Sequence, residues 1–327
     1  MTREDRILLD RNLLANPAMW LEPANDGRHQ LRDAPAMRES IPYIVSLPEQ
    51  GLAAFVYTWV DRQSVAGYAC AIFGPALPDG PVVGRMDGVQ MQPDDNFDDW
   101  RIGDFYLSQD LEMHRARIEW KTDGAALAMD FEATHPAYGF ANDPRGCWEF
   151  FADDRLEQGG LARGTITVGG KEYPFDATGH RDHSWGARDW EITHHWKWLV
   201  AQSGADIALH VFQMFVRGKI ELRGFVFKDG QQAEVTGFEC DFELDDALRQ
   251  KTLNGTITDS LGRTTVFTSS CFAVQPLHPE PHTCLYEGAL DMVIDGRKSL
   301  GWVEFKWPQA DIDHSLQLAS EGRAYKV

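Results

Sequence analysis

Short apolar runs separated by turn-forming residues cover most of the chain and predict β-strands from residue 53 onward. In the first half, these runs are residues 53–60, 67–74, 115–122 and 126–134. The dipeptide Asp123-Gly124 is a strong signal for a short hairpin, and Gly169-Gly170 predicts another. Residues 74–99 are rich in Pro, Gly and Asp, so we expect an irregular connection there.

The second half has a more regular pattern, in which runs of alternating apolar and polar residues are separated by glycine turns. These turns are Ser203-Gly204, Asp229-Gly230, Leu261-Gly262 and Asp295-Gly296. Regular spacing of this kind is typical of an antiparallel meander, and a meander of many strands closes into a barrel or folds into a sandwich.

The N-terminal segment has a different period. Between Thr2 and Asn16 the apolar residues recur close to helical spacing, and Pro17 ends the pattern, which predicts a short amphipathic helix. The polar, proline-containing stretch that follows, through about Pro48, is expected to wrap over the surface. No other segment predicts a long helix, although residues 245–250 are compatible with a single turn.

Together these patterns predict an all-β protein of two antiparallel β-barrels in tandem, with a short N-terminal helix. The first barrel, with the helix and the wrapping segment, is expected in residues 1–165. The second barrel is expected in residues 166–327.

Composition argues against several classes of partner. The 327-residue chain has 31 Lys+Arg and 50 Asp+Glu, a net charge of −19, which repels nucleic acid and anionic membranes. No apolar run is long enough for a transmembrane helix, and the polar start offers no signal-peptide core. The five cysteines are odd in number and widely spaced, which indicates reduced thiols and a cytoplasmic location.

Residues 179–190, GHRDHSWGARDW, differ from the rest of the chain because they concentrate ionisable and aromatic side chains. One interpretation is structural: Arg181 or Arg188 pairs with Asp182 or Asp189, and the tryptophans pack around the pairs. A second is a metal site. Its candidate ligands are His180, Asp182 and His183, with His194, His195 or His210.

A third interpretation is acid–base catalysis. A histidine oriented by an aspartate can exchange a proton near neutral pH, and tryptophan faces can stabilise a developing carbocation. The chain has no nucleophile elbow, dinucleotide fingerprint, phosphate loop or zinc-protease pair, so these chemistries have no support.

Aromatic and acidic residues on later strands extend the candidate site. Trp196 and Trp198 share one face of a strand by period 2 and form either a ligand-binding wall or a contact surface. Tyr286 and Glu287 are adjacent on a later strand. On the last strand, Trp302 and Glu304 share a face, where a glutamate needs a partner such as Arg181 or Arg188.

The block G-H-R-D-H-S-W-G-x-R-D-W, preceded by a Gly-Gly hairpin and followed by many short strands, resembles the carotenoid 1,2-hydratase (hydroxyneurosporene synthase-like) and AttH-like family. The resemblance implies two lipocalin-like (calycin) barrels with the motif near their junction. It also implies proton-driven chemistry on isoprenoid or other lipophilic substrates, without a metal or nucleotide. Kievitone hydratase-like enzymes and, more distantly, tocopherol cyclases are relatives of this family.

Carried over to this chain, the family's His-x-Trp falls on His183 and Trp185, directly after Asp182. The hydratases complete their acid with a Tyr-x-Asp on a following strand, where this chain has His210-Val211-Phe212. The proton donor is therefore expected among Asp182, His210 and two downstream acids, Glu287 and Glu304.

We therefore expect a cofactor-independent hydratase, dehydratase, isomerase or cyclase that acts on a lipophilic, terpenoid- or steroid-like molecule. A non-enzymatic carrier of a lipophilic ligand is the alternative. His183 is the expected proton-transfer residue, oriented by Asp182 or Asp189, with Arg188 as an electrostatic anchor. The expected substrate-binding residues are Trp185, Trp190, Trp196, Trp198, Tyr286, Trp302 and Glu304. No metal or other cofactor is expected.

Overall fold

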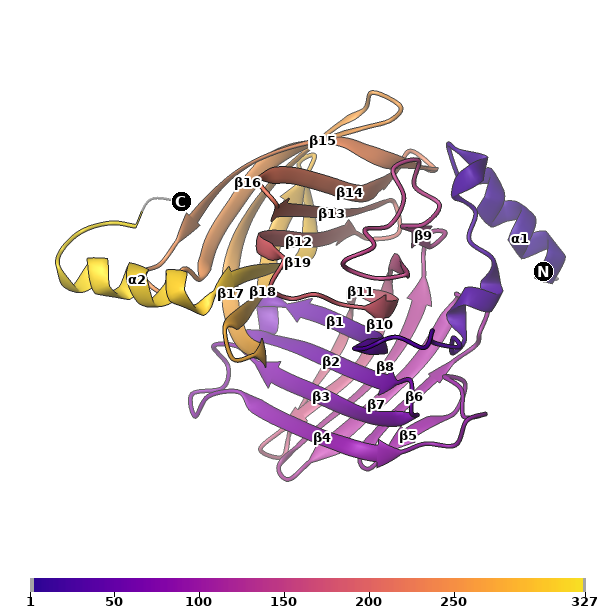
Figure 1. The fold of residues 1–327 in the computed structure, drawn as a ribbon, viewed down its shortest axis with the longest axis horizontal. Helices are drawn as coiled ribbons and strands as arrows, with labels where there is room; N and C mark the ends of the chain where they lie inside the picture. Colours follow the sequence, from indigo (N-terminus) through magenta and orange to yellow (C-terminus); the bar gives the residue numbers. More distant parts are fainter. Residues whose placement is uncertain (1–2, 326–327) are drawn as a thin grey trace.

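The computed structural model describes residues 3–325 and consists of two antiparallel, barrel-like β-sheets in tandem with one helix near each end. Figure 1 shows the first sheet below and the second barrel above it, and β1, β10 and β11 of the first sheet contact the second barrel. The predicted all-β class and the pair of barrels are confirmed.

The first sheet has eleven strands in the order β4-β3-β2-β1-β11-β10-β8-β7-β6-β5, with β9 paired to β10. It curls until β5 contacts β3. Its strands are β1 (Met37–Leu47), β2 (Leu52–Asp61), β3 (Val65–Phe73), β4 (Val82–Gln90), β5 (Trp100–Ile102), β6 (Phe105–Gln109), β7 (Arg115–Thr122), β8 (Ala125–Ala133), β9 (Tyr138–Gly139), β10 (Asp154–Val168) and β11 (Lys171–Ala187).

The second sheet is a meander of eight strands that closes into a barrel when β19 pairs with β12. Its strands are β12 (Thr193–Ser203), β13 (Ile207–Val216), β14 (Lys219–Lys228), β15 (Gln231–Leu244), β16 (Gln250–Asp259), β17 (Thr264–Glu280), β18 (Thr283–Ile294) and β19 (Arg297–Pro308). β17 and β18 extend toward the first sheet, where β17 contacts β3 and β18 contacts β1 (Figure 1).

We predicted that the stretch through about Pro48 wraps over the surface. This prediction is wrong for its C-terminal part, because residues 37–47 form the central strand β1. The strand pairs with both β2 and β11, and ten of its eleven residues are buried. A strand covered on both faces loses the apolar–polar alternation that reveals half-exposed strands. The expected connection over residues 74–99 likewise contains a strand, β4.

The chain passes from the first sheet to the second between Ala187 and Thr193. The domain boundary was expected earlier, between residues 165 and 166. The Gly169-Gly170 turn joins β10 and β11 into one long hairpin, and β11 also pairs with β1. Both strands therefore belong to the first sheet, and the GHRDHSWGARDW motif begins on the last strand of that sheet.

Three large apolar cores and one small cluster result from this arrangement. One fills the first barrel, a second fills the second barrel, and a third lies between the two sheets. Trp196, Trp198 and Val200 belong to the third core, so this face of β12 points away from its own barrel and toward the first sheet. The aromatic face predicted on β12 is therefore a contact between the barrels.

Helices lie near both ends of the described chain. α1 (Arg3–Asn12) confirms the N-terminal prediction within the described residues. α2 (Gln309–Ser320) contradicts the expectation of no further long helix; it packs on the second barrel through Ile312. Three short 3-10 helices complete the described elements: η1 (Pro17–Met19), η2 (Pro23–Asp26) and η3 (Pro48–Gln50). Neither α1 nor α2 is long and apolar enough to cross a membrane.

The packing of α2 yields a stability prediction. Ile312→Ala removes a buried side chain and leaves a cavity against the second barrel, so the free energy of unfolding should fall by about 2–4 kcal/mol. Leu316→Ala, on the exposed face of the same helix, should change it by less than about 0.5 kcal/mol. Denaturant titration measures both, and equal effects would contradict the docking of α2.

Candidate functional site

The motif on β11 divides between two faces because side chains alternate along a strand. Arg181 and His183 point into the first barrel, where they contact Asp26 and Glu39. His180, Asp182 and Ser184 point the other way, toward the second barrel. Neighbouring motif residues therefore belong to two separate clusters.

The cluster in the first barrel is a network of buried hydrogen bonds. Arg181 donates to Asp26 Oδ1 at 2.6 Å and to Gln158 Oε1 at 2.9–3.0 Å. His183 Nε2 lies 2.6 Å from Glu39 Oε1, and the same oxygen is 2.7 Å from His29 Nδ1. The partner of His183 is thus Glu39, and neither Asp182 nor Asp189 orients it as expected.

The cluster between the barrels is organised by Arg155 on β10. Its Nε donates to Glu157 Oε1 at 2.5 Å and its Nη2 donates to Asp182 Oδ2 at 2.6 Å. The guanidinium also lies over the rings of Phe151 and Phe212. The register of the β10–β11 hairpin places Glu157 directly opposite Asp182. All three charged groups are buried, so each depends on the others for its compensating charge.

Burial raises the pKa of both carboxyl groups around Arg155. The pKa of Asp182 rises to about 8, because loss of hydration and the charges of Glu157 and Glu304 outweigh the stabilising charge of Arg155. The pKa of Glu157 rises to about 7, again mainly because of burial. The single guanidinium of Arg155 therefore balances only part of the negative charge of the two carboxyl groups. Asp182 and Glu157 together retain a proton near neutral pH.

A second pair of acids faces this cluster from the other barrel. Glu287 on β18 and Glu304 on β19 are directly opposite in register, and their carboxyl groups share a hydrogen bond. Trp302 Nε1 donates to Glu287 at 2.6 Å, and Trp196 Nε1 donates to Glu304 at 2.7 Å. Burial and the neighbouring Glu304 raise the pKa of Glu287 well above its ordinary value. This pair therefore also holds a proton.

Two adjoining cavities open beside these acids. The inner cavity, of about 170 Å³, lies between the barrels and is lined by Asp182, Arg155, Glu287, Glu304 and aromatic side chains. The outer cavity, of about 410 Å³, is lined partly by exposed residues. The two share Arg38, Ser40, Tyr57, Trp59, Phe151, Ser184, Arg188 and Trp190. An apolar molecule in the inner cavity would contact the protonated carboxyl groups.

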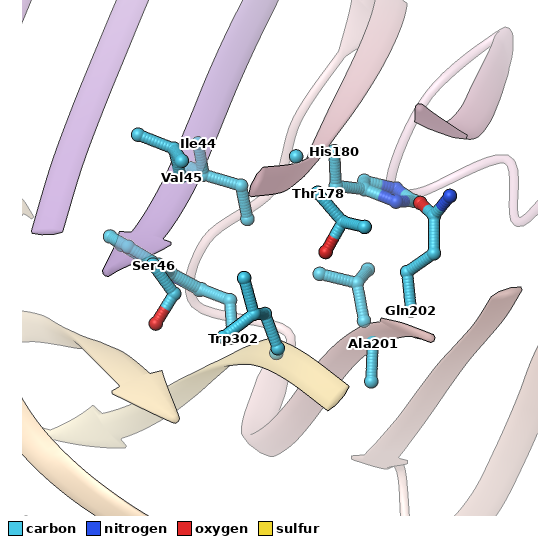
Figure 2. A pocket seen from close by; sticks show the side chains of 12 residues that line it. Ile44, Val45, Ser46, Thr178, His180, Ala201, Gln202 and Trp302 are labelled. Carbon is cyan, nitrogen blue, oxygen red and sulfur yellow. The ribbon is translucent and has the colours of Figure 1, made fainter. Parts of the chain in front are cut away.

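A smaller cavity of about 20 Å³ lies deeper in the contact between the sheets. Figure 2 shows Ile44, Val45 and Ser46 on one side of it and Trp302, Ala201 and Gln202 on the other, with Thr178 and His180 nearby. A cavity of this size holds about one water molecule, so it belongs to the packing of the barrels.

The histidines proposed as metal ligands do not form one site. His183 lies on the opposite face of β11 from His180, while a bulge in β12 leaves His194 exposed beside Asp311 and turns His195 toward the Lys306 carbonyl. Two groups bring possible ligands within 4.8 Å of one another: His29, Glu39 and His183, and Glu157, His180 and His210. The second group contains two of the predicted ligands, His180 and His210. In the second group, the charge of Arg155 opposes a cation.

The structure gathers half of the sequence-predicted site residues at the inner cavity, namely Asp182, Arg188, Trp190, Trp196, Trp198 and Glu304. Trp185 lines only the outer cavity, stacked on His29. His210 and Trp302 are buried behind the cavity wall, and Tyr286 faces the interior of the second barrel. Asp189 is exposed and accepts hydrogen bonds from the backbone of Glu191 and Ile192.

Sequence reasoning missed Arg155, Glu157 and Glu39. Arg155 and Glu157 could have been predicted from the turn at Gly169-Gly170. This turn fixes the strand register that puts Glu157 opposite Asp182. The turn at Asp295-Gly296 likewise puts Glu287 opposite Glu304. Glu39 had no such signal, since it lies on the strand that the alternation did not reveal.

The comparisons with known proteins agree with this architecture. The model of a family described as "Domain of unknown function (DUF7064)" matches residues 22–309. Among curated proteins, none matches the sequence.

Solved structures with a similar fold share little sequence with this chain. A candidate AttH from Nitrosomonas europaea has a TM-score of 0.65 at 14% identity, over 89% of this chain and 98% of that one. Kievitone hydratase from Nectria haematococca has a TM-score of 0.59 at 14% identity, over 89% and 94%. CghA with Sch210972 has a TM-score of 0.58 at 12% identity, over 90% and 98%. These matches confirm the AttH-like fold that the motif implied.

The buried histidines between the barrels yield a pH prediction. Burial, with the nearby charges of His180 and Arg155, lowers the pKa of His210 well below its ordinary value. The native protein therefore keeps His210 neutral, while the unfolded chain takes up a proton below about pH 6.5, so stability falls as the pH falls below that value. Each such histidine contributes a slope of up to about 1.4 kcal/mol per pH unit.

His210→Phe should flatten this dependence, because the ring remains among aromatic side chains but can no longer be protonated. The measurement is the free energy of unfolding between pH 6.5 and about 5. His282→Phe, at an exposed position, serves as the matched control and should keep the wild-type slope. An unchanged slope in His210→Phe would contradict the neutral state of His210.

Proposed function

The chain belongs to the DUF7064 family, and we propose that it is a cofactor-independent acid–base enzyme acting on a lipophilic substrate in the inner cavity. The reaction is a hydration or dehydration, a double-bond migration, or a cyclisation. These reactions share a first step, in which a protonated carboxyl group donates its proton to an unsaturated carbon. The substrate class is terpenoid- or steroid-like, or another apolar molecule of comparable shape.

One observation carries this proposal: buried carboxyl groups with raised pKa values line an aromatic cavity. Asp182, Glu287 and Glu304 line the cavity, and Glu157 lies directly behind its wall. Four guanidinium groups also line it, those of Arg38, Arg85, Arg155 and Arg188. Among the described residues, only Arg155 of these arginines forms ion pairs with the acids, namely with Glu157 and Asp182. Burial raises the pKa of Asp182, Glu157 and Glu287, which favours their protonated forms. A cavity that stores protons beside apolar walls suits the protonation of a carbon atom.

Asp182 is the proposed proton donor, because it lines the cavity and its pKa of about 8 leaves it protonated at neutral pH. Arg155 holds the carboxylate that remains after transfer. The rings of Trp196 and Trp198 face the same space, where their π-electrons stabilise a carbocation. Water or a substrate double bond then captures the cation, or loss of a proton forms a new double bond.

His183 does not fit the role that the motif suggested. It is fully buried inside the first barrel, hydrogen-bonded to Glu39 and separated from the inner cavity by the sheet itself. We assign it a structural role, in which it ties β11 to β1. The reaction class proposed here agrees with the name of kievitone hydratase, which has a similar fold.

Turnover of lipophilic probes tests this proposal. Purified protein is incubated with farnesol and retinol, with the corresponding acids, farnesoic and retinoic acid, and with a steroid enone. Mass spectrometry follows a gain or loss of water or the formation of an isomer. We expect conversion of at least one probe without added metal or nucleotide. Asp182→Asn should lower the rate at least about a hundredfold, because the amide cannot supply the proton.

Asp176→Asn is the matched control, since this exposed aspartate lies on the same strand and should leave the rate unchanged. Circular dichroism verifies that both variants are folded. Intact probes that co-purify or bind without conversion would favour the alternative, a carrier. Equal rates in the wild type and Asp182→Asn would exclude Asp182 as the donor.

A further inference from the structure

Two part-buried arginines at the boundary between the inner and outer cavities differ from the fully buried ones. Arg155 and Arg181 each form a short ion pair with a carboxylate. Arg38 and Arg188 have no carboxylate within 4 Å among the described residues 3–325. Both nevertheless lie in a partly enclosed, aromatic environment.

The contacts of Arg188 leave most of its donors available. Its Nη2 donates to Ser184 Oγ at 3.1 Å, and the guanidinium lies over the rings of Phe151 and Trp190 at 4.5 and 5.1 Å. Burial, together with the positive charges of Arg155 and Arg38, lowers the pKa of Arg188. The charge of Asp182 acts in the opposite direction, but this carboxyl group is engaged by Arg155, so Arg188 has no direct ion-pair partner among the described residues. A guanidinium withdrawn from water without such a partner is costly.

Arg38 is in a similar position on the neighbouring strand. Its Nη2 donates to Tyr57 Oη at 2.5 Å, and its guanidinium lies 4.8 Å from the centre of the Trp59 ring. Its Nε is buried and has no hydrogen-bond partner. Arg38 pairs with Gly186 in the β1–β11 register, so it is close to Arg188 in space.

Side chains of the protein do not supply the missing negative charge. Glu280, near the end of β17, lines the outer cavity but is exposed and lies beyond 4 Å of either guanidinium. Asp87 is already engaged by Arg85. Asp61 accepts hydrogen bonds from the backbone of Gln63 and Val65.

We propose that Arg38 and Arg188 bind the carboxylate of the substrate, which is therefore a lipophilic carboxylic acid rather than a neutral hydrocarbon or alcohol. Planar guanidinium groups bind a carboxylate through paired, charge-assisted hydrogen bonds. The hydroxyl groups of Ser40 and Ser184, 3.2 Å apart, lie beside the same position and complete the site. The proposal rests on the proposed function for the location of the apolar body in the inner cavity.

This arrangement fixes the direction in which the substrate binds. The carboxylate lies at the boundary with the outer cavity, and the apolar body extends toward Trp196, Trp198 and Leu285. Asp182 is two residues from Ser184 on the same face of β11, about 7 Å along the strand. The proton is therefore delivered to a carbon near the carboxylate end of the molecule.

A pair of probes that differ only in charge tests the carboxylate site. The fluorescence of cis-parinaric acid and of its methyl ester is titrated with the full-length protein. We expect the acid to bind at least about tenfold more tightly than the ester. Arg188→Gln and Arg38→Gln should each weaken binding of the acid about tenfold and leave the affinity for the ester within about twofold.

Arg101→Gln is the matched control, because this exposed arginine is paired with Asp99 and its loss changes the net charge equally. It should keep the wild-type preference. If Arg188→Gln does not fold, Arg38→Gln carries the same test.

The outcomes separate the two proposals. Equal affinities for acid and ester in the wild type, or a preference that survives both arginine substitutions, would overturn the carboxylate site alone, because the turnover test does not depend on it. Failure of both probes to bind would overturn the carboxylate site and the lipophilic inner cavity together.

Discussion

The buried guanidinium of Arg155 is the interaction on which the rest of the site depends. A cation removed from water needs charged partners and a complete set of hydrogen bonds, and Arg155 finds them in Glu157 and Asp182. These three groups lie on the outer face of the first sheet. They are buried only because β12 and its tryptophans cover them. The contact between the barrels therefore creates the low-polarity environment that raises the pKa values of both acids.

The alternation of side chains along β11 explains why one short motif supports two roles. Arg181 and His183 stabilise the first barrel through Asp26 and Glu39, on the N-terminal segment and β1. Asp182 and Ser184 form part of the cavity wall. The structural and the catalytic interpretations of the motif are therefore compatible, because each concerns a different face of the same strand.

Much of the fold could be predicted from the sequence, because half-exposed strands and glycine turns leave clear patterns. β1 could not be predicted, since both of its faces are covered and its apolar run is interrupted by Pro42. α2 was missed because a strand leads directly into it. For the site, period 2 correctly grouped Trp196 with Trp198. Period 2 also places His183 and Asp182 on opposite faces of β11, so adjacent residues of a strand cannot form the expected histidine–aspartate pair.

The most direct test of the account is whether carboxyl groups in the inner cavity are protonated at neutral pH. Infrared difference spectroscopy of the wild type against Asp182→Asn and Glu287→Gln detects the carbonyl stretch of a protonated carboxylic acid, which shifts in heavy water. The account predicts such a band in the wild type at neutral pH and a weaker band in each variant. A wild-type spectrum with carboxylate bands alone, unchanged by either substitution, would contradict it.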